Sequence, residues 1–243
     1  MGRKLSDIKN KVDNSNVEFL DYLRDNLQGS NFDLLLKISK KTNVIIFSGV
    51  IRNFFLKKSD IRDLDIVLKE KVDIEDIFQD ATEIRKNSFG GYKININSLK
   101  FDIWYLEDTW ALNYQKSFDF GELEKLMPNT AFFNFSSIVF SFDEKKFYYS
   151  KSFLSFLRYK EIDVVYKPNM HYKLCVVNTF YYSKKYNLKI AKELFSFIRH
   201  IHISSDGDYK EVQIKHFGKV LFSNKDLAYN VLNEVCQKNI QLV

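Results

Sequence analysis

Apolar residues at helical spacing run through the first forty positions of the chain. Those that lie four or seven residues apart are Ile8, Val12, Phe19, Leu23 and Leu27. This spacing returns side chains to the same face of a helix. Together with a further apolar group at residues 34–38, the pattern predicts two helices between residues 5 and 39.

From residue 44 the pattern changes to short apolar runs, which are typical of buried strands. Val44–Phe47 and Leu64–Leu68 predict two such strands, and Ile51–Leu56 predicts a short helix between them. A helical pattern over residues 72–78 follows. This stretch is therefore expected to alternate between strand and helix.

Two later stretches predict β-hairpins. Residues 89–106 contain two apolar or alternating pieces, and the polar pair Asn97-Ser98 separates them as a turn. Residues 132–141 and 147–149 are rich in aromatic and β-branched side chains, and they flank a polar turn at residues 143–144. Each hairpin is expected to add two strands to a sheet.

Helical spacing returns after Pro168 and continues towards the end of the chain. The expected fold class is α+β, with a small mixed or antiparallel sheet flanked by helices and followed by an all-helical C-terminal part. The expected domains are residues 1–168, which include N-terminal helices over residues 1–40, and residues 169–243.

The composition suits a globular protein, and a cytoplasmic location is expected. Apolar residues make up 45% and aromatic residues 16% of the 243 positions, enough to fill a hydrophobic core. No apolar run approaches the roughly 20 residues that span a bilayer, so no membrane association is expected. The two cysteines, Cys175 and Cys236, support neither a disulfide framework nor a four-ligand zinc site.

Two carboxylates on the second predicted strand carry the clearest chemical signal. Asp63 and Asp65 are two residues apart, and alternate residues of a strand project from the same face. Mg²⁺ prefers hard oxygen ligands and commonly joins one or two carboxylates to substrate phosphates. The pair therefore predicts a magnesium site for a nucleoside triphosphate.

The turn before the predicted short helix suits a triphosphate. Gly49 has no side chain, so backbone N–H groups of the Ser48-Gly49 turn would reach phosphate oxygens. Arg52, one turn later, would offer a charged fork to the same group. Arg62 is expected to point to the opposite face of the strand from Asp63.

In order and spacing these motifs resemble the head domain shared by CCA-adding tRNA nucleotidyltransferases and bacterial poly(A) polymerases, within the polymerase-β-like nucleotidyltransferases. Ser48-Gly49, Arg52-Asn53 and Asp63-Leu64-Asp65 are similar to the family's Gly-Gly turn, Arg-Asp pair and Asp-x-Asp strand. Phe89-Gly90-Gly91 resembles its Phe-Gly-Thr strand start. Phe101-Asp102-Ile103 falls where the family has a third acidic strand residue.

The resemblance covers about residues 43–185, including FNFSSIVF at residues 133–140, which is similar to the family's Phe-Thr-Ile-Asn-Ala-Leu-Ala-Tyr strand. It implies a nucleotidyltransferase with a two-Mg²⁺ site, which transfers NMP from an NTP such as ATP to a hydroxyl group and releases pyrophosphate. The implied metal ligands and catalytic residues are Asp63, Asp65 and Asp102. The residues implied to bind the nucleotide are Ser48, Gly49, Arg52 and Asn53.

The sequence departs from the family pattern at three places. Ser48 and Asn53 replace a glycine and an aspartate, and Thr130-Ala131-Phe132 replaces a basic Arg-Arg-Asp triplet. In the predicted helix after Met170, the Asp and Arg side chains that select C and A in the family are not recognisable. The resemblance therefore indicates the reaction better than the substrate.

The acceptor is expected to be RNA, with the 3′ end of tRNA as one candidate. The net charge of +6 suits a polyanionic partner. Three lysines of the C-terminal part are weaker candidates for acceptor contacts: Lys173, Lys184 and Lys185. The alternatives are a protein or small-molecule acceptor, as in toxin-type or antibiotic-modifying enzymes, or an inactive nucleotidyltransferase-fold protein that binds or regulates a partner. The sequence leaves the nucleotide, a possible protein partner and the oligomeric state open.

Overall fold

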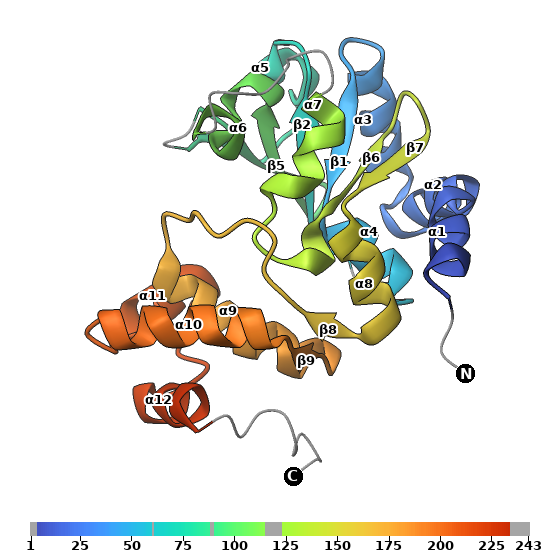
Figure 1. Cartoon of the computed structure of the whole chain (residues 1–243). Coiled ribbons are helices and arrows are strands. Elements are labelled where there is room, and N and C mark those ends of the chain that lie inside the picture. The colour runs from blue at the N-terminus through green and yellow to red at the C-terminus, as the bar shows by residue number, and fades with distance from the viewer. Residues whose placement is uncertain (1–3, 60, 88–89, 115–122, 234–243) are drawn as a thin grey trace. The chain divides into compact units, whose positions relative to one another are not determined.

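The computed structural model describes residues 4–59, 61–87, 90–114 and 123–233 (Figure 1). The chain divides into two compact units. The first contains Met1–Ala131 and Phe135–Leu154, and the second contains Phe132–Asn134 and Ser155–Val243. Whether the two domains meet at residue 168 stays a prediction.

A mixed seven-stranded sheet forms the centre of the first unit, which confirms the α+β fold class. The strands are β1 (Val44–Phe47), β2 (Asp63–Leu68), β3 (Glu83–Lys86), β4 (Tyr92–Ile96), β5 (Leu99–Tyr105), β6 (Ile138–Ser141) and β7 (Lys146–Tyr149). Their order across the sheet is β3-β4-β5-β2-β1-β6-β7. Only the β2–β5 pair is parallel among these neighbours.

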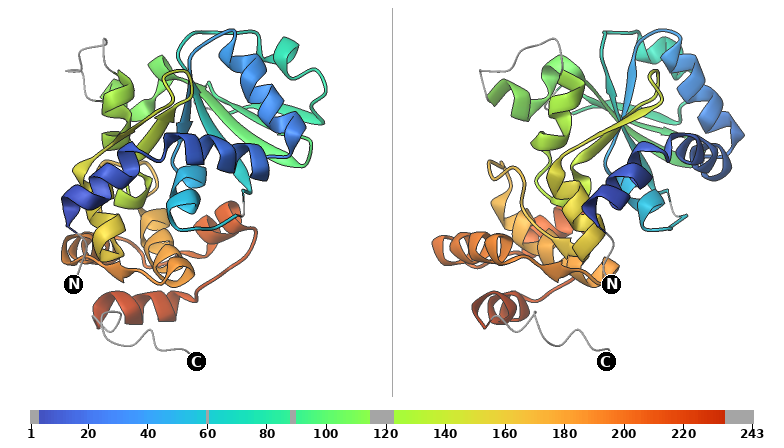
Figure 2. Two further views of the ribbon diagram at one scale, coloured as in Figure 1. Left: turned by 90° about the vertical axis from the view of Figure 1, so that its right-hand side faces the viewer. Right: turned by 45° about the vertical axis from the view of Figure 1, so that its right-hand side comes forward.

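Helices cover both faces of this sheet (Figure 2, right). The helices of the first unit are α1 (Leu5–Asp13), α2 (Asn16–Asn26), α3 (Gly29–Ser39), α4 (Gly49–Phe55), α5 (Ile74–Ile77), α6 (Trp110–Tyr114), α7 (Leu123–Leu126) and α8 (Lys151–Tyr159), which extends into the second unit. Short 3₁₀ turns are η1 (Leu106–Asp108), η3 (Met127–Thr130) and η4 (Asn134–Ser136). The N-terminal segment forms three helices rather than two, because the chain leaves helical conformation at residues 14–15 and again at residues 27–28, where Gln28 has a positive φ of 58°.

The two faces of β2 differ in chemistry, and this difference positions the site. Leu64 and Ile66 face a fully buried layer, on which Phe19 of α2 packs edge-on against Phe140 of β6 with ring centroids 4.9 Å apart. The other face begins with Asp63 and Asp65, and further along it becomes apolar. There a second core cluster forms from Ile45, Val67, Leu106, Leu112, Met127 and Val139. The sheet therefore has one apolar face and one face that is half acidic.

The two predicted hairpins form as β4–β5 and β6–β7. Asn97 and Ser98 both have positive φ, 48° and 63°, as a two-residue turn of the primed type requires. The second hairpin is shorter than predicted, because Asn134–Ser136 is a 3₁₀ turn and β6 begins only at Ile138. Strand β3 and helix α8 were not predicted.

The second unit is mainly helical, in line with the sequence pattern. Its helices are α9 (Tyr172–Tyr186), α10 (Lys192–Ser204), α11 (Lys210–Phe217) and α12 (Asn224–Leu232). A two-residue parallel pair, β8 (Glu161–Ile162) with β9 (Lys189–Ile190), was not predicted. Cys175 is buried in α9, and burial raises the pKa of its thiol to about 12, whereas Cys236 lies outside the described residues. Within the described parts of the chain, no helix is both long and apolar enough to cross a membrane.

Gly91 is required where β4 approaches β5. A Cβ atom at this position would lie 2.8 Å from the carbonyl oxygen of Ile103 and 3.3 Å from the Cβ of Trp104. We expect Gly91→Ala to lower the free energy of unfolding by roughly 1–3 kcal/mol, because the backbone of β5 must move. Gly29→Ala is the matched control, since a Cβ there meets nothing within 4 Å. Urea unfolding checks both, and equal effects would contradict the packing argument.

Candidate active site

Strands β2 and β5 bring three carboxylates to one face of the sheet. Asp65 is in register with Asp102 on the neighbouring parallel strand, and Asp63 precedes Asp65 by two residues. All three side chains therefore project from the half-acidic face. The sequence placed Asp63 and Asp65 together by alternation, and the parallel pairing adds Asp102.

The pKa of Asp65 is raised in the folded chain. Burial raises the pKa of its carboxyl, and the negative charges of Asp63 and Asp102 raise it further, to about 7. The positive charges of Arg52 and Arg62 act in the opposite direction. A cation placed between these carboxylates would remove the repulsion that raises this pKa.

Two of the carboxylates already have a basic partner. The Arg62 guanidinium donates from Nη2 to Oδ2 of Asp63 at 2.7 Å. The expectation that Arg62 points to the other face was therefore wrong: it precedes the first residue of β2, so strand alternation does not fix its direction. The ammonium of Lys93 on β4 lies 3.6 Å from Oδ1 of Asp102.

The turn between β1 and α4 adjoins Asp65. A Cβ atom on Gly49 would lie 3.8 Å from Oδ2 of Asp65 and 4.0 Å from Nη2 of Arg52. The bare backbone of Gly49 therefore borders both the acidic group and the guanidinium. Ser48 stands at φ 51° and ψ −85°, a left-handed conformation that favours glycine. Its N–H donates to the carbonyl oxygen of Ile138 at 3.3 Å.

We expect Ser48→Gly to raise the free energy of unfolding by about 1 kcal/mol, because it relieves the positive-φ strain. Ser59→Gly is the control, since Ser59 lies in an exposed loop and is not at positive φ. That change is expected to lower stability slightly through the added freedom of the unfolded chain. Urea unfolding measures both values, and a destabilised Ser48→Gly protein would contradict the strain argument.

Arg52 is held within the fold by its neighbours. It is buried in α4, and its Nε and Nη2 donate to Oδ1 of Asn53 at 3.4 and 3.3 Å. Its guanidinium carbon lies 5.2 Å from the ring centroid of Phe135. Asn53 thus orients Arg52 in the described structure; a direct contact of Asn53 with nucleotide stays a prediction.

Comparison with solved structures agrees with this arrangement of strands. A structure of the CCA-adding enzyme with CTP superposes with a TM-score of 0.61 at 9% identity, covering 86% of this chain and 53% of that one. The same type of enzyme with ATP gives 0.60 at 12% identity, with 86% and 52% covered. A tRNA nucleotidyltransferase with a primer tRNA and an ATP analog gives 0.50 at 15% identity, with 68% and 48% covered. This chain has the nucleotidyltransferase fold.

Because the sequence identities are only 9–15%, the likeness concerns the fold alone. The chain spans about half the length of the chains in these structures. No protein-family model and no curated protein matches the sequence. Ser48 adopts a backbone conformation that favours glycine. Phe89, at the start of the motif that resembles Phe-Gly-Thr, lies outside the described residues.

The three lysines proposed to bind an acceptor all lie on α9 of the second unit. Lys173 forms an ion pair with Asp206 at 2.6 Å, and the ammonium of Lys185 lies 5.3 Å from the ring centroid of Tyr186. Lys184 is exposed. Their role in acceptor binding stays a prediction.

Lys93 is the site residue that the sequence reasoning missed. A signal for it was present: a two-residue turn at Asn97-Ser98 fixes the register of the hairpin and pairs position 93 with position 102. The same register places Lys93 on the face of the three carboxylates. Lys93 therefore continues the cross-strand row that begins at Asp65 and Asp102.

Proposed function

We propose that this chain is a Mg²⁺-dependent nucleotidyltransferase that moves NMP from an NTP to a hydroxyl group, with RNA as the first-choice acceptor. The observation that carries the proposal is the group of three carboxylates, with a half-buried Asp65 whose pKa is raised, next to the Gly49 turn and Arg52. Each feature separately has ordinary structural explanations. Their juxtaposition in the nucleotidyltransferase fold supports an active site.

The donor set suits a divalent cation. Carboxylate oxygens are the hard ligands that Mg²⁺ prefers, and a cation would relieve the repulsion at Asp65. Within the described residues, no three side chains of the His, Cys, Asp and Glu types are already arranged to hold a metal ion. Asp63, Asp65 and Asp102 would hold the ion or ions after their side chains adjust. Bound Mg²⁺ would supply stabilisation of the charge that develops on phosphoryl oxygens.

The protein groups would divide the rest of the reaction among them. Backbone N–H groups at Gly49 and the positive charge of Arg52 would hold the β- and γ-phosphates. Asp102 would orient the acceptor hydroxyl and take its proton as the oxygen attacks the α-phosphorus. A bond then forms between that oxygen and the α-phosphorus, the bond to the β-phosphate oxygen breaks, and pyrophosphate leaves with the electron pair.

A second candidate is a nucleotidyltransferase-fold protein that binds a partner without turnover. The observations that favour it are Asn53 in place of the family's acidic residue and the basic partners that Asp63 and Asp102 already have. Retention of all three carboxylates and Arg52 favours the enzyme. A protein or small molecule as acceptor would use the same site.

One labelling experiment separates these candidates. The purified chain is incubated with each α-³²P-labelled NTP, beginning with ATP and CTP, in Mg²⁺ with total cellular RNA and protein. We expect the label to appear in RNA and to be removed by ribonuclease. Label in a protein or in a small molecule would identify that molecule as the acceptor instead. If the chain binds nucleotide but no label is transferred from any NTP, the binding protein without turnover is favoured.

A further inference from the structure

Two of the three carboxylates in the candidate site are paired with exposed basic side chains. Arg62 reaches Asp63 at 2.7 Å, and Lys93 lies 3.6 Å from Asp102. The side chain of Arg62 is 78% exposed and that of Lys93 is 65% exposed. Both side chains are therefore largely exposed, while their charged ends contact the acids.

These two cations flank the acids from different elements. Lys93 on β4 is in register with Asp102 on β5, which is in register with Asp65 on β2. Arg62 lies one residue before β2 begins, next to Asp63. A lysine therefore adjoins Asp102, and an arginine adjoins Asp63.

Such ion pairs open easily. Exposed pairs contribute only about 0.2–1 kcal/mol, because water screens the charges and the long side chains lose freedom. A divalent cation brings twice the charge and binds carboxylate oxygens directly. It would therefore displace the basic side chains from Asp63 and Asp102. The displaced side chains would remain within reach of any phosphate bound beside the ion.

We propose that Arg62 and Lys93 are exchangeable counter-ions of the site: they pair with Asp63 and Asp102 before a metal binds, and afterwards they hold phosphate oxygens of the nucleotide. The inference rests on the proposed nucleotidyltransferase function and adds two positioning residues to it. It has an unusual consequence. Removing either cation should strengthen binding of the metal alone and weaken binding of the metal–nucleotide complex.

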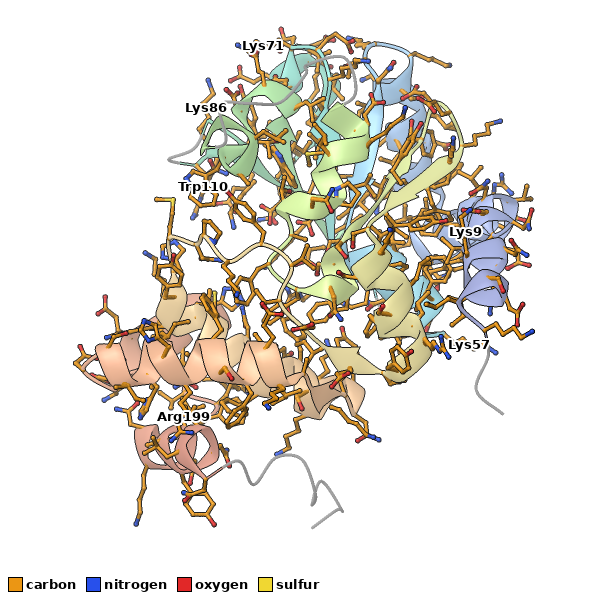
Figure 3. The ribbon with its side chains drawn as sticks, viewed as in Figure 1. Lys9, Lys57, Lys71, Lys86, Trp110 and Arg199 are labelled. Atoms are coloured by element: carbon orange, nitrogen blue, oxygen red, sulfur yellow. The ribbon has the colours of Figure 1, made fainter. Side chains whose placement is uncertain are left out.

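The first test measures Mn²⁺ binding to the whole chain by electron paramagnetic resonance, without nucleotide. We expect Arg62→Gln and Lys93→Gln each to bind Mn²⁺ about two- to fivefold more tightly, as loss of an exposed competing ion pair predicts. The controls are Arg24→Gln and Lys86→Gln. Arg24 on α2 pairs with Asp21 at 2.8 Å, and the ammonium of Lys86 lies 5.3 Å from the Tyr92 ring centroid at the outer edge of the sheet (Figure 3).

The second test measures ATP binding at saturating Mn²⁺ by calorimetry. The same two variants are expected to bind ATP at least about fivefold more weakly, because each loses a charge-assisted contact with phosphate. Arg62→Lys and Lys93→Arg keep the charge and should retain most of the affinity. The two control variants should match the wild type in both tests. Urea midpoints equal to the wild-type value show that all the variants are folded.

The outcomes separate the inference from the proposed function. Wild-type protein that binds no Mn²⁺ would overturn both. If the wild type binds Mn²⁺ and Asp65→Asn weakens that binding, the site stands. Arg62→Gln and Lys93→Gln proteins that then behave like the controls, or that lose affinity for Mn²⁺, would overturn the counter-ion inference alone.

Discussion

Asp65→Asn is expected to lower nucleotidyl transfer by at least about 10³-fold while the chain stays folded. An amide at this position loses the charge that would bind a cation, and metal stabilisation of a reacting phosphoryl group contributes several kcal/mol. About 1.4 kcal/mol corresponds to a factor of ten in rate. The effect should be large because Asp65 is central, in register with Asp102 and two residues from Asp63.

The rate of label transfer from α-³²P-NTP at saturating Mg²⁺ measures this loss. Asp33→Asn is the matched control, since Asp33 is an exposed carboxylate on α3 with no position in the site. It should retain wild-type activity. Asp65→Asn protein that keeps more than about a tenth of the wild-type rate would contradict the assignment of Asp65 as a metal ligand.

The same substitution is expected to stabilise the metal-free chain at pH 8. The pKa of Asp65 is raised from 3.8 to about 7 in the folded chain, so between these values the folded state binds more protons than the unfolded state. The free energy of unfolding of the wild type therefore falls as the pH rises from about 4 to 7. The amide of the Asp65→Asn variant carries no charge, so the free energy of unfolding of the variant does not fall in this way as the pH rises. The advantage of the variant at pH 8 is at most about 4 kcal/mol.

Urea unfolding in EDTA at pH 4.5 and pH 8 measures this difference. The stability gap between variant and wild type should be small at the lower pH and larger at the higher one. Added Mg²⁺ at pH 8 should stabilise the wild type and leave Asp65→Asn unchanged. If the gap has the same size at both pH values, ionisation of Asp65 does not lower the stability of the folded chain, and the prediction is wrong.

Local patterns in the sequence predicted the features that depend on near neighbours. Strand alternation placed Asp63 and Asp65 on one face, and a polar pair marked the turn of the β4–β5 hairpin. The mixed α+β class followed from apolar runs between helical segments. These features can be predicted because burial of one face of a strand sets its alternation of apolar and polar residues within a few positions.

Features that depend on distant parts of the chain were not predictable in the same way. The strained backbone of Ser48 breaks the usual preference of a side chain for negative φ, and only the surrounding fold maintains it. The direction of Arg62 is set by a carboxylate partner rather than by strand alternation. The placement of Asp102 beside Asp65 required knowing which strands pair in parallel, which no local pattern determines.

The most direct test of the central claim is the release of pyrophosphate, because this product forms whatever the acceptor is. The wild type and an Asp63→Ala/Asp65→Ala double variant are incubated with γ-³²P-labelled NTPs, Mg²⁺ and a cell extract in which pyrophosphatase is inhibited. Chromatography separates labelled pyrophosphate from phosphate. We predict NTP-dependent pyrophosphate release with the wild type and only the extract background with the variant. Equal release by the two proteins would contradict the account.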